Sequence, residues 1–400
     1  MSSTQFPGRP SEFSGLWILG IFMLLALCGP SVRAQTNITS TPAATNAPSN
    51  FRSPEDNWLD VSKFLDKQYG FLPVAIPITE PAVGYGGFGA LAFLDKPLGS
   101  ALAGYGRPDI TAVGGLGTEN GTWGVLAFNV HHWFDDQLQT QVALIYASVN
   151  LDFYGIGEDT QLQSQPLRYN LEPRGGFVQG KYRLWGSRFW VGLRYAIFST
   201  QVTFNEPPGT PGIPSFSRVS NVGGLTPTLT YDSRDNIFTP TSGSYVEADS
   251  GLYSEVFGGD TDFQRPSLTG IQYFPLSQKW TLGFRGNFTG SFGDVPFYMR
   301  PYISLRGAAA FRYQGDEVAQ IESEVRWQFW KRFSLVGFVG GGAAWNNGAQ
   351  FQNTDAILTG GTGFRYELAR EYGLHVVLDV AFSRDTTAVY LQIGSAWGGL

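Results

Sequence analysis

The alternating stretch Ile321-Glu322-Ser323-Glu324-Val325-Arg326-Trp327-Gln328-Phe329 decides how the rest of this chain is interpreted. Successive side chains of a β-strand point to opposite faces, so one face of this strand is apolar and the other carries Glu322, Glu324 and Arg326. A soluble β-sandwich would bury the apolar face and expose the polar face to water. A membrane barrel would turn the apolar face to lipid and the polar face to its lumen.

The composition favours the membrane barrel. Of 400 residues, 42% are hydrophobic, 15% aromatic and only 15% charged, whereas about 25% charged residues is usual in soluble proteins. After the N-terminus no uninterrupted apolar run approaches the roughly 18 residues that a spanning helix requires, so many short alternating strands remain as the membrane-crossing elements. The formal net charge of −6, with no basic run, argues against nucleic acid as a partner.

The N-terminal region predicts three segments before the barrel. Residues 1–34 have the layout of a secretory signal peptide, with an apolar run and small residues before an expected cut after Ala34. Residues 35–57 are rich in Ser, Thr, Asn, Pro and Ala and predict a flexible linker. Residues 58–76 begin with apolar residues at helical spacing, and we expect a short helix there that lies at the membrane surface or plugs the barrel mouth. The barrel would occupy residues 77–400.

The single cysteine, Cys28, falls inside the expected signal peptide. A lipid-modified cysteine needs a small residue directly before it, and Leu27 is bulky, so we do not expect a lipid anchor. The mature chain would then have no disulfide and no thiolate metal site.

From residue 82 onward the sequence predicts about sixteen strands, an even number as in single-chain bacterial barrels. The first is 82–94 and the last 387–397, with 165–172 and 176–186 counted as separate strands. The long connections all follow odd-numbered strands, whereas the tight turns follow even-numbered ones. The long connections are 95–108, 204–221, 291–316 and 345–355, and the tight turns are 119–121, 275–277 and 370–371. This asymmetry predicts one antiparallel transmembrane β-barrel with both ends of the chain on the short-turn side.

Two further alternating strands place polar side chains toward the lumen. Arg285 opposes an apolar face that includes Trp280 and Phe284, and Asp379 opposes one that includes Leu378. In the last strand the same alternation puts Trp397 on the lipid face with Leu391. Many tryptophans lie near predicted strand ends, as an interfacial aromatic girdle would place them.

Motifs for chemistry are weak. Gly175-Gly176-Phe177-Val178-Gln179-Gly180-Lys181 matches the start of a phosphate-binding loop, but Tyr182 replaces the required Ser or Thr and no helix follows. The three histidines, His131, His132 and His375, have no serine partner at a triad-like setting, and His375 with Asp379 reads as one lumenal polar pair among several. We therefore expect no enzymatic activity, no cofactor and no metal.

Arg306 is the residue that we expect to fix a loop inside the barrel. It lies in the long connection just before the strand that carries Glu322, Glu324 and Arg326. If this connection, loop 6, folds inward, the Arg306 guanidinium can meet Glu324, where partial burial favours a bidentate pair. The alternative is an exposed loop arginine that faces solvent.

Four motifs of this sequence resemble those of one known family. The first is Tyr231-Asp232-Ser233-Arg234-Asp235-Asn236-Ile237-Phe238-Thr239-Pro240-Thr241-Ser242-Gly243-Ser244-Tyr245. It resembles the periplasmic-turn signature of the bacterial surface antigen superfamily, the BamA/TamA-like outer-membrane assembly and translocation barrels. Leu305-Arg306-Gly307-Ala308 resembles its loop-6 element, in which an aromatic residue usually takes the place of Ala308. Phe338-Val339-Gly340-Gly341-Gly342 resembles the following strand motif, in which an Asp commonly takes the place of Gly340. Gln392-Ile393-Gly394-Ser395-Ala396-Trp397 is similar to the C-terminal signal by which such barrels are recognised for insertion.

The resemblance covers residues 77–397 and implies a 16-stranded barrel with loop 6 inside. Arg306 and Gly307 would form a latch on the wall, and a seam between the strands 82–94 and 387–397 would open laterally. Because Gly340 cannot supply the family's acidic partner, Glu324 would hold Arg306 alone. Members that insert or export proteins carry polypeptide-transport-associated (POTRA) modules, and residues 35–81 are too few for one.

The sequence thus leads to two functional hypotheses. The first is an outer-membrane barrel that assists insertion or passage of a polypeptide or a lipid through its seam. Its partners would be the lipid bilayer, an unknown client, and a periplasmic protein or lipoprotein. The second hypothesis is a passive channel or structural surface barrel that keeps the scaffold without handling clients.

Overall fold

The computed structural model describes residues 51–67, 70–80, 82–94, 109–156, 161–205, 216–347 and 355–397. The predicted signal peptide 1–34, and the predicted linker 35–57 up to residue 50, lie outside these ranges. Within the ranges most residues are in β-strands, and no helix there has the length and apolar character to cross a membrane.

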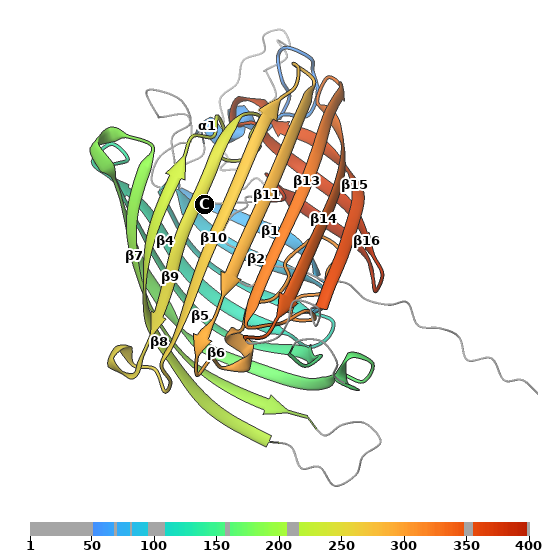
Figure 1. Cartoon of the computed structure of the whole chain (residues 1–400). Coiled ribbons are helices and arrows are strands. Elements are labelled where there is room, and N and C mark those ends of the chain that lie inside the picture. Colours follow the sequence, from blue (N-terminus) through green and yellow to red (C-terminus); the bar gives the residue numbers. More distant parts are fainter. Residues whose placement is uncertain are drawn as a thin grey trace, which may run out of the picture.

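Antiparallel strands form a barrel wall in which neighbours in sequence are paired (Figure 1). The strands are β1 Gly70–Glu80, β2 Gly84–Leu94, β3 Ile110–Thr118, β4 Trp123–Trp133, β5 Leu138–Phe153, β6 Leu167–Arg183, β7 Phe189–Phe204, β8 Phe216–Asp232, β9 Gly243–Tyr253, β10 Phe263–Pro275, β11 Trp280–Gly290, β12 Phe292–Gly293, β13 Glu317–Trp330, β14 Phe333–Trp345, β15 Asp355–Ala369, β16 Leu374–Ser383 and β17 Thr387–Ile393. The helix α1 is Ser62–Lys67, and short 3-10 turns are η2 Gln161–Gln163, η3 Leu184–Gly186, η4 Glu255–Phe257, η5 Phe297–Met299 and η7 Arg370–Tyr372. Since β12 has only two residues, sixteen strands build the wall, which confirms the predicted all-β barrel.

The agreement in strand number rests on two errors that cancel. β1 lies partly within residues 58–76, for which the sequence predicts a helix, and the helix α1 is confined to Ser62–Lys67. Sequence reasoning misses β1 because Pro73 and Pro77 interrupt its pattern, and proline is tolerated in a sheet mainly on edge strands. The predicted strands 165–172 and 176–186 are the single strand β6, which continues through Pro173.

These errors also misplace one loop. We call the end of the barrel where loop 6, residues 291–316, leaves the wall the loop end, and the opposite end the turn end. Counting antiparallel strands back from β11 puts the strand ends joined by residues 95–109 at the turn end, and the turn after β3 at the loop end. The prediction that all long connections share one end is therefore wrong for 95–108. β1 starts and β17 finishes at the turn end.

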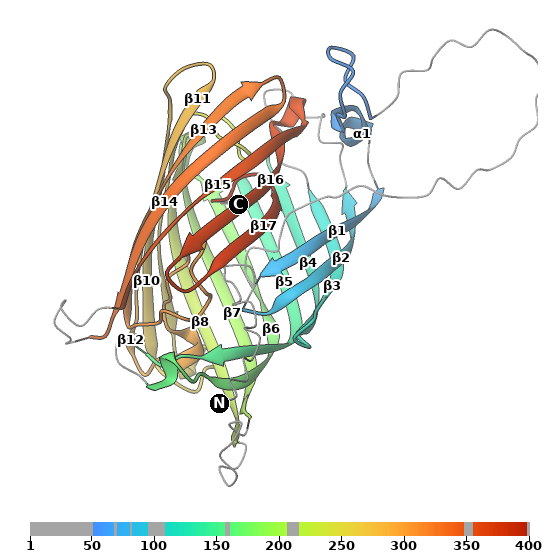
Figure 2. The same ribbon diagram turned by 90° about the vertical axis from the view of Figure 1, so that its right-hand side faces the viewer.

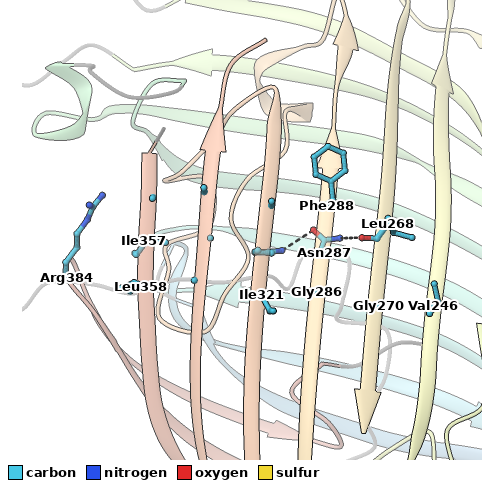
Figure 3. A pocket seen from close by; sticks show the side chains of 16 residues that line it. Val246, Leu268, Gly270, Gly286, Asn287, Phe288, Ile321, Ile357, Leu358 and Arg384 are labelled. Carbon is cyan, nitrogen blue, oxygen red and sulfur yellow. Dashed lines mark hydrogen bonds between the residues drawn. The ribbon is translucent and has the colours of Figure 1, made fainter. Parts of the chain in front are cut away.

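The wall is apolar outside and polar inside. Ile321 is 60% exposed, whereas its neighbour Glu322 is 1% exposed. On the outer face of β9 to β15, glycines form the floor of a shallow apolar groove, because Gly270, Gly286 and Gly341 stand in one register row with Ile321 (Figure 3). An apolar outer surface of this kind matches the interior of a bilayer.

The wall has one open seam, between β1 and β17 (Figure 2). In the described residues β1 forms a ladder with β2 and β17 with β16, and these two edge strands approach each other without a ladder between them. The predicted seam strand 82–94 is therefore corrected. It is β2, the second strand of the wall, because β1 precedes it.

The N-terminal segment 51–67 is fixed to the turn end of the wall. Arg332, in the turn between β13 and β14, is 1% exposed, and its guanidinium contacts Asp56 at 2.7 Å and Asp60 at 2.8 Å. The Arg332 hydrogen bond holds the pKa of the Asp56 carboxyl below its usual range. Trp58 packs edge-to-face on Trp330 at 5.3 Å between ring centroids. The helix thus sits against strand turns, beside the barrel mouth (Figure 1).

Candidate functional site: the lumenal latch and the terminal hairpin

Loop 6 folds into the barrel and is anchored there by an apolar side. Ile303, Leu305, Ala308 and Tyr313 are almost completely buried and pack against Val318, Ala344 and Ile357 of β13, β14 and β15. Burying apolar side chains of this size fixes the loop without directional bonds. It also positions Arg306 against the inner wall.

Arg306 contacts three carboxylates from two strands. Its Nε donates to Glu322 Oε1 at 2.6 Å, and its Nη1 lies 2.8 Å from Glu324 Oε2 and 2.8 Å from Asp379 Oδ2. The guanidinium carbon also lies 3.7 Å from the centre of the Phe338 ring. Burial alone would lower the pKa of Arg306, but the surrounding carboxylates more than offset burial and raise it. We call Arg306, Gly307 and these three acids the latch.

The role of Gly340 is different from the one expected from the sequence. Gly340 stands opposite Glu322 in the β13–β14 register, and a Cβ at Gly340 would lie 3.3 Å from Glu322 Cγ. The missing side chain therefore leaves room for Glu322. The expectation that Glu324 holds Arg306 alone is wrong, because Glu322 and Asp379 share that role. Asp379 reaches Arg306 from β16 because the barrel curves, a proximity that sequence spacing cannot show.

A second guanidinium offsets part of the negative charge that remains in this cluster. Arg365 of β15 is 3% exposed and donates to Asp379, with Nη2 at 3.1 Å from Oδ2, and it lies 3.6 Å from Glu324 Oε2. Three carboxylates, of which Glu322 and Asp379 are fully buried, are thus faced by two guanidinium groups. The sequence analysis missed Arg365. The alternation along β15 was a usable signal, because it turns Leu358 to the outer face and the odd-numbered residues, including Arg365, to the lumen.

The latch touches the last strand directly. The Gly307 N–H donates to the Tyr390 hydroxyl of β17 at 2.9 Å. Gly307 has φ +87°, and a Cβ there would lie 3.3 Å from Ala381 Cβ, so glycine permits the loop to lie close against β16. At the loop end Tyr313 donates to Asp385, in the turn between β16 and β17. We call β16 and β17 the terminal hairpin, and loop 6 holds it from inside at three levels.

Trp397 also belongs to this arrangement, which corrects its predicted position on the lipid face. β17 ends at Ile393, and Gly394 with φ +95° turns the chain inward, so the alternation of the strand no longer applies. Trp397 is 5% exposed, lies 5.7 Å from Tyr273 between ring centroids, and donates from Nε1 to Glu322 Oε1 at 3.1 Å. The predicted C-terminal signal residues thus separate, with Gln392 in β17 and Trp397 in the lumen.

The predicted periplasmic-turn motif lies at the turn end, between β8 and β9, and is tightly bonded within itself. Arg234 donates to both oxygens of Asp232, at 2.9 Å each, and its guanidinium lies 4.5 Å from the centre of the Tyr245 ring. Asp235 accepts from backbone N–H groups of residues 241 and 242. Gly243 has φ +97°, and a Cβ there would clash with the Ser233 backbone. Tyr231 is the residue before Asp232 at the end of β8.

This turn also reaches the terminal hairpin. Asn236 donates to the Tyr372 carbonyl at 2.9 Å, and Thr239 Oγ1 lies 3.0 Å from His375 Nδ1. The expected His375–Asp379 pair is therefore not formed, since Asp379 is bonded to Arg306 and Arg365. Asn236 and Thr239 thus hold the terminal hairpin at the turn end, whereas loop 6 holds it closer to the loop end.

The remaining lumen-facing predictions have structural partners. Arg285 donates to the Ser304 carbonyl at 3.3 Å and so supports loop 6. Arg326 donates to the Pro240 carbonyl at 2.9 Å and so supports the β8–β9 turn. Neither side chain contacts the latch acids as a direct ion pair in the described chain.

An apolar wall, a lumenal loop held by buried ion pairs and an unsealed first–last seam define a bacterial outer-membrane β-barrel. Residues 217–384 match the model of the Omp85 superfamily domain. This confirms the resemblance to BamA/TamA-like barrels and the outer-membrane location.

Solved structures of the same fold are similar at low sequence identity. BamA from Haemophilus ducreyi lacking POTRA domains 1-3 is 12% identical with a TM-score of 0.53, over 86% of this chain and 79% of that chain. CdiB from Escherichia coli is 10% identical with a TM-score of 0.56, over 80% of this chain and 61% of that chain. CdiB from Acinetobacter baumannii is 10% identical with a TM-score of 0.52, over 81% of this chain and 59% of that chain. The chain thus spans about three fifths of each CdiB. No curated protein gave a match.

Proposed function

We propose that this barrel assists the membrane insertion or passage of a polypeptide through the seam between β1 and β17. The observation that carries the proposal is the seam itself, where two edge strands approach without a ladder. Unpaired backbone groups are costly in a bilayer, so such a seam offers binding sites for another chain. A lipid passing through the same opening would not satisfy those backbone groups, which favours a polypeptide as the client.

The length of β17 supports the same function. β17 has 7 residues and β16 has 10, whereas β6 and β8 have 17 each. At about 3.3 Å per residue β17 is less than half as long as β6 or β8. The other strands beside the seam, β16 and β1, are about three fifths as long, with 10 and 11 residues. A bilayer thins to match a short hydrophobic surface, and a thinner, less ordered bilayer is easier to enter.

The latch would control the opening. Moving the terminal hairpin outward separates Asp379 from Arg306 and Tyr390 from Gly307, and it withdraws Trp397 from Glu322. These are a few separate contacts, whereas a continuous ladder would have to break along the whole strand. We also propose that the latch residues and Gly394 matter to function through this movement.

The proposal includes partners outside the described residues. The bilayer, an unfolded client polypeptide and a periplasmic or lipoprotein partner are the expected ones. A signal peptide in residues 1–34 and a linker from residue 35 would deliver and tether the barrel. Residues 51–67, which Arg332 holds at the turn end, would then be the surface nearest such a partner.

Locking the seam tests the proposal. Ala75→Cys in β1 with Leu391→Cys in β17, in a Cys28→Ser background, would be oxidised in phosphatidylethanolamine-containing vesicles that hold the barrel. The probe is a urea-denatured eight-stranded outer-membrane barrel, and its folding is followed by gel mobility. We expect the folding of the probe to be accelerated by the reduced protein and not by the oxidised one.

The matched control is Val142→Cys with Val178→Cys. These residues stand directly opposite in the β5–β6 register and both face outward, so their disulfide locks a pair that has no need to open. A seam-locked barrel that works as well as the control would mean that lateral insertion is wrong and that a passive or structural barrel is the better description.

A further inference from the structure

β1 contains two prolines at positions where a barrel wall ordinarily needs backbone donors. Its sequence is Gly-Phe-Leu-Pro-Val-Ala-Ile-Pro-Ile-Thr-Glu, with Pro73 and Pro77 four residues apart. Because the backbone N–H groups of a strand alternate between its two sides, both prolines remove a donor from the same side. The side they affect follows from the hydrogen bonds of the neighbouring strands.

The prolines face the seam. The backbone carbonyl of Tyr85 in β2 accepts a hydrogen bond from the Glu119 N–H, on the β3 side. The backbone groups of the odd-numbered residues of β2 therefore point toward β3, and those of the even-numbered residues point toward β1. The β1–β2 register joins even residues to even residues, such as Gly70 to Leu94. The odd residues of β1, which include Pro73 and Pro77, therefore direct their backbone groups toward the seam.

β17 presents a complete edge to the same seam. The Gly394 N–H donates to the His375 carbonyl of β16, so the even residues of this segment are bonded toward β16. The backbone groups of the odd-numbered residues point toward the seam, and each of these residues has both an N–H and a carbonyl. They are Thr387, Val389, Leu391 and Ile393.

The two edges are thus chemically unequal. The seam side of β1 has a carbonyl at each odd residue, but N–H donors at Phe71, Ala75 and Thr79 only. In an antiparallel ladder each facing pair exchanges two hydrogen bonds, and a pair that contains proline forms one. Each proline therefore weakens closure of β1 on β17. It also lowers the cost of leaving the seam open, because an absent donor cannot be left unsatisfied in the bilayer.

We propose that the free edge of β17 is the docking site for an extended segment of the inserting polypeptide, and that Pro73 and Pro77 keep β1 from occupying or competing for that edge. A strand added to β17 forms every hydrogen bond of the ladder, whereas a strand added to β1 loses one at each proline. The incoming segment would run antiparallel to β17 and place alternate apolar side chains in the lipid beside Val389 and Leu391, which are 42% and 37% exposed.

This inference rests on the proposed function, and photo-crosslinking distinguishes the two. A photoreactive amino acid is placed at Val389 or Leu391 on β17, at Ala75 or Thr79 on β1, and at Val142 on β5 as a control far from the seam. The probe is the same urea-denatured eight-stranded barrel, added to vesicles that contain each variant.

We expect crosslinks to the β17 positions to exceed those to the β1 positions by about tenfold, a ratio that one to two hydrogen bonds can produce. Equal or stronger crosslinking at β1, with folding of the probe still accelerated, would overturn the docking site and leave the proposed function intact. Crosslinks at β17 without acceleration would support the docking site and contradict the proposed function. Crosslinks at neither strand would overturn the inference.

Restoring the donors gives a second, client-free test. Pro73→Val with Pro77→Val should allow β1 to pair with β17, so backbone hydrogen exchange of the segment 387–393 in detergent micelles should slow by about tenfold. Probe crosslinking at Val389 should fall with it. Pro266→Val, a change of the same type in β10, which pairs with β9 away from the seam, should alter neither measurement. Unchanged exchange in the double variant would show that the prolines do not hold the seam open.

Discussion

Removing the latch arginine should destabilise the barrel through the acids that it leaves behind. In Arg306→Ala the carboxylates of Glu322, Glu324 and Asp379 stay close together, with Arg365 as their remaining cation. Glu322 and Asp379 are 1% and 0% exposed, so water cannot replace the lost guanidinium. Breaking a buried ion pair by removing one partner costs about 3–5 kcal/mol, and we expect a loss of unfolding free energy in that range.

The same argument predicts strong coupling between the partners. Asp379→Asn alone removes a charge that Arg306 and Arg365 both need and should cost about 2–4 kcal/mol. In the double variant Arg306→Ala with Asp379→Asn, the neutral amide no longer repels Glu322 and Glu324. The loss of unfolding free energy in the double variant should therefore be about 1–3 kcal/mol smaller than the sum of the two single losses. The free energy would be measured by urea unfolding in lipid vesicles at pH 7, followed by tryptophan fluorescence.

Two observations would decide whether this reasoning holds. Arg194→Ala is the matched control. The guanidinium carbon of Arg194 lies 5.9 Å from the centre of the Phe177 ring, and losing this contact should lower the free energy of unfolding by only about 0.5–1 kcal/mol. Losses for Arg306→Ala and Asp379→Asn that add within about 0.5 kcal/mol would refute the shared cluster. Hydrogen exchange in residues 387–393 should accelerate in Arg306→Ala, since Gly307 then no longer holds Tyr390 in place.

Three further predictions concern other contacts. Trp397→Phe removes the hydrogen bond to Glu322 and should lower the free energy of unfolding by about 1–3 kcal/mol in the same urea titration, with an unchanged midpoint arguing against the inward C-terminus. Gly243→Ala forces a side chain into a turn with φ +97° and should slow or prevent folding of the barrel, measured by gel mobility; a normally folding variant would contradict the strained turn. Because the pKa of Asp56 is lowered in the folded state, its bond to Arg332 contributes stability above about pH 4 and loses it as the pH falls through the lowered pKa. Limited proteolysis should therefore release the N-terminal segment in acid, and Asp56→Asn should weaken that pH dependence, with Asp60 as the carboxylate that remains on Arg332.

The sequence determined the type of barrel because the relevant signals are local. Alternation along a strand has a period of two residues, so Glu322, Glu324 and Arg326 could be assigned to the lumen from their spacing alone. The low charge and the motif around Arg306 pointed in the same direction. The strand boundaries failed where proline and glycine interrupt the pattern, at Pro73 in β1 and at Pro173 in β6, since a local signal cannot distinguish an edge strand from a linker.

The functional detail depended on which distant strands the closed wall brings together. Asp379 is 73 residues from Arg306, and Trp397 is 75 residues from Glu322, yet both pairs are hydrogen-bonded inside the barrel. Curvature of the wall and the turn at Gly394 create these contacts, and neither has a periodic signature in the sequence. The sequence by itself therefore determined an outer-membrane barrel with a lumenal arginine. Only the tertiary structure decided that the arginine holds the terminal hairpin, and that the open seam lies beside the prolines of β1.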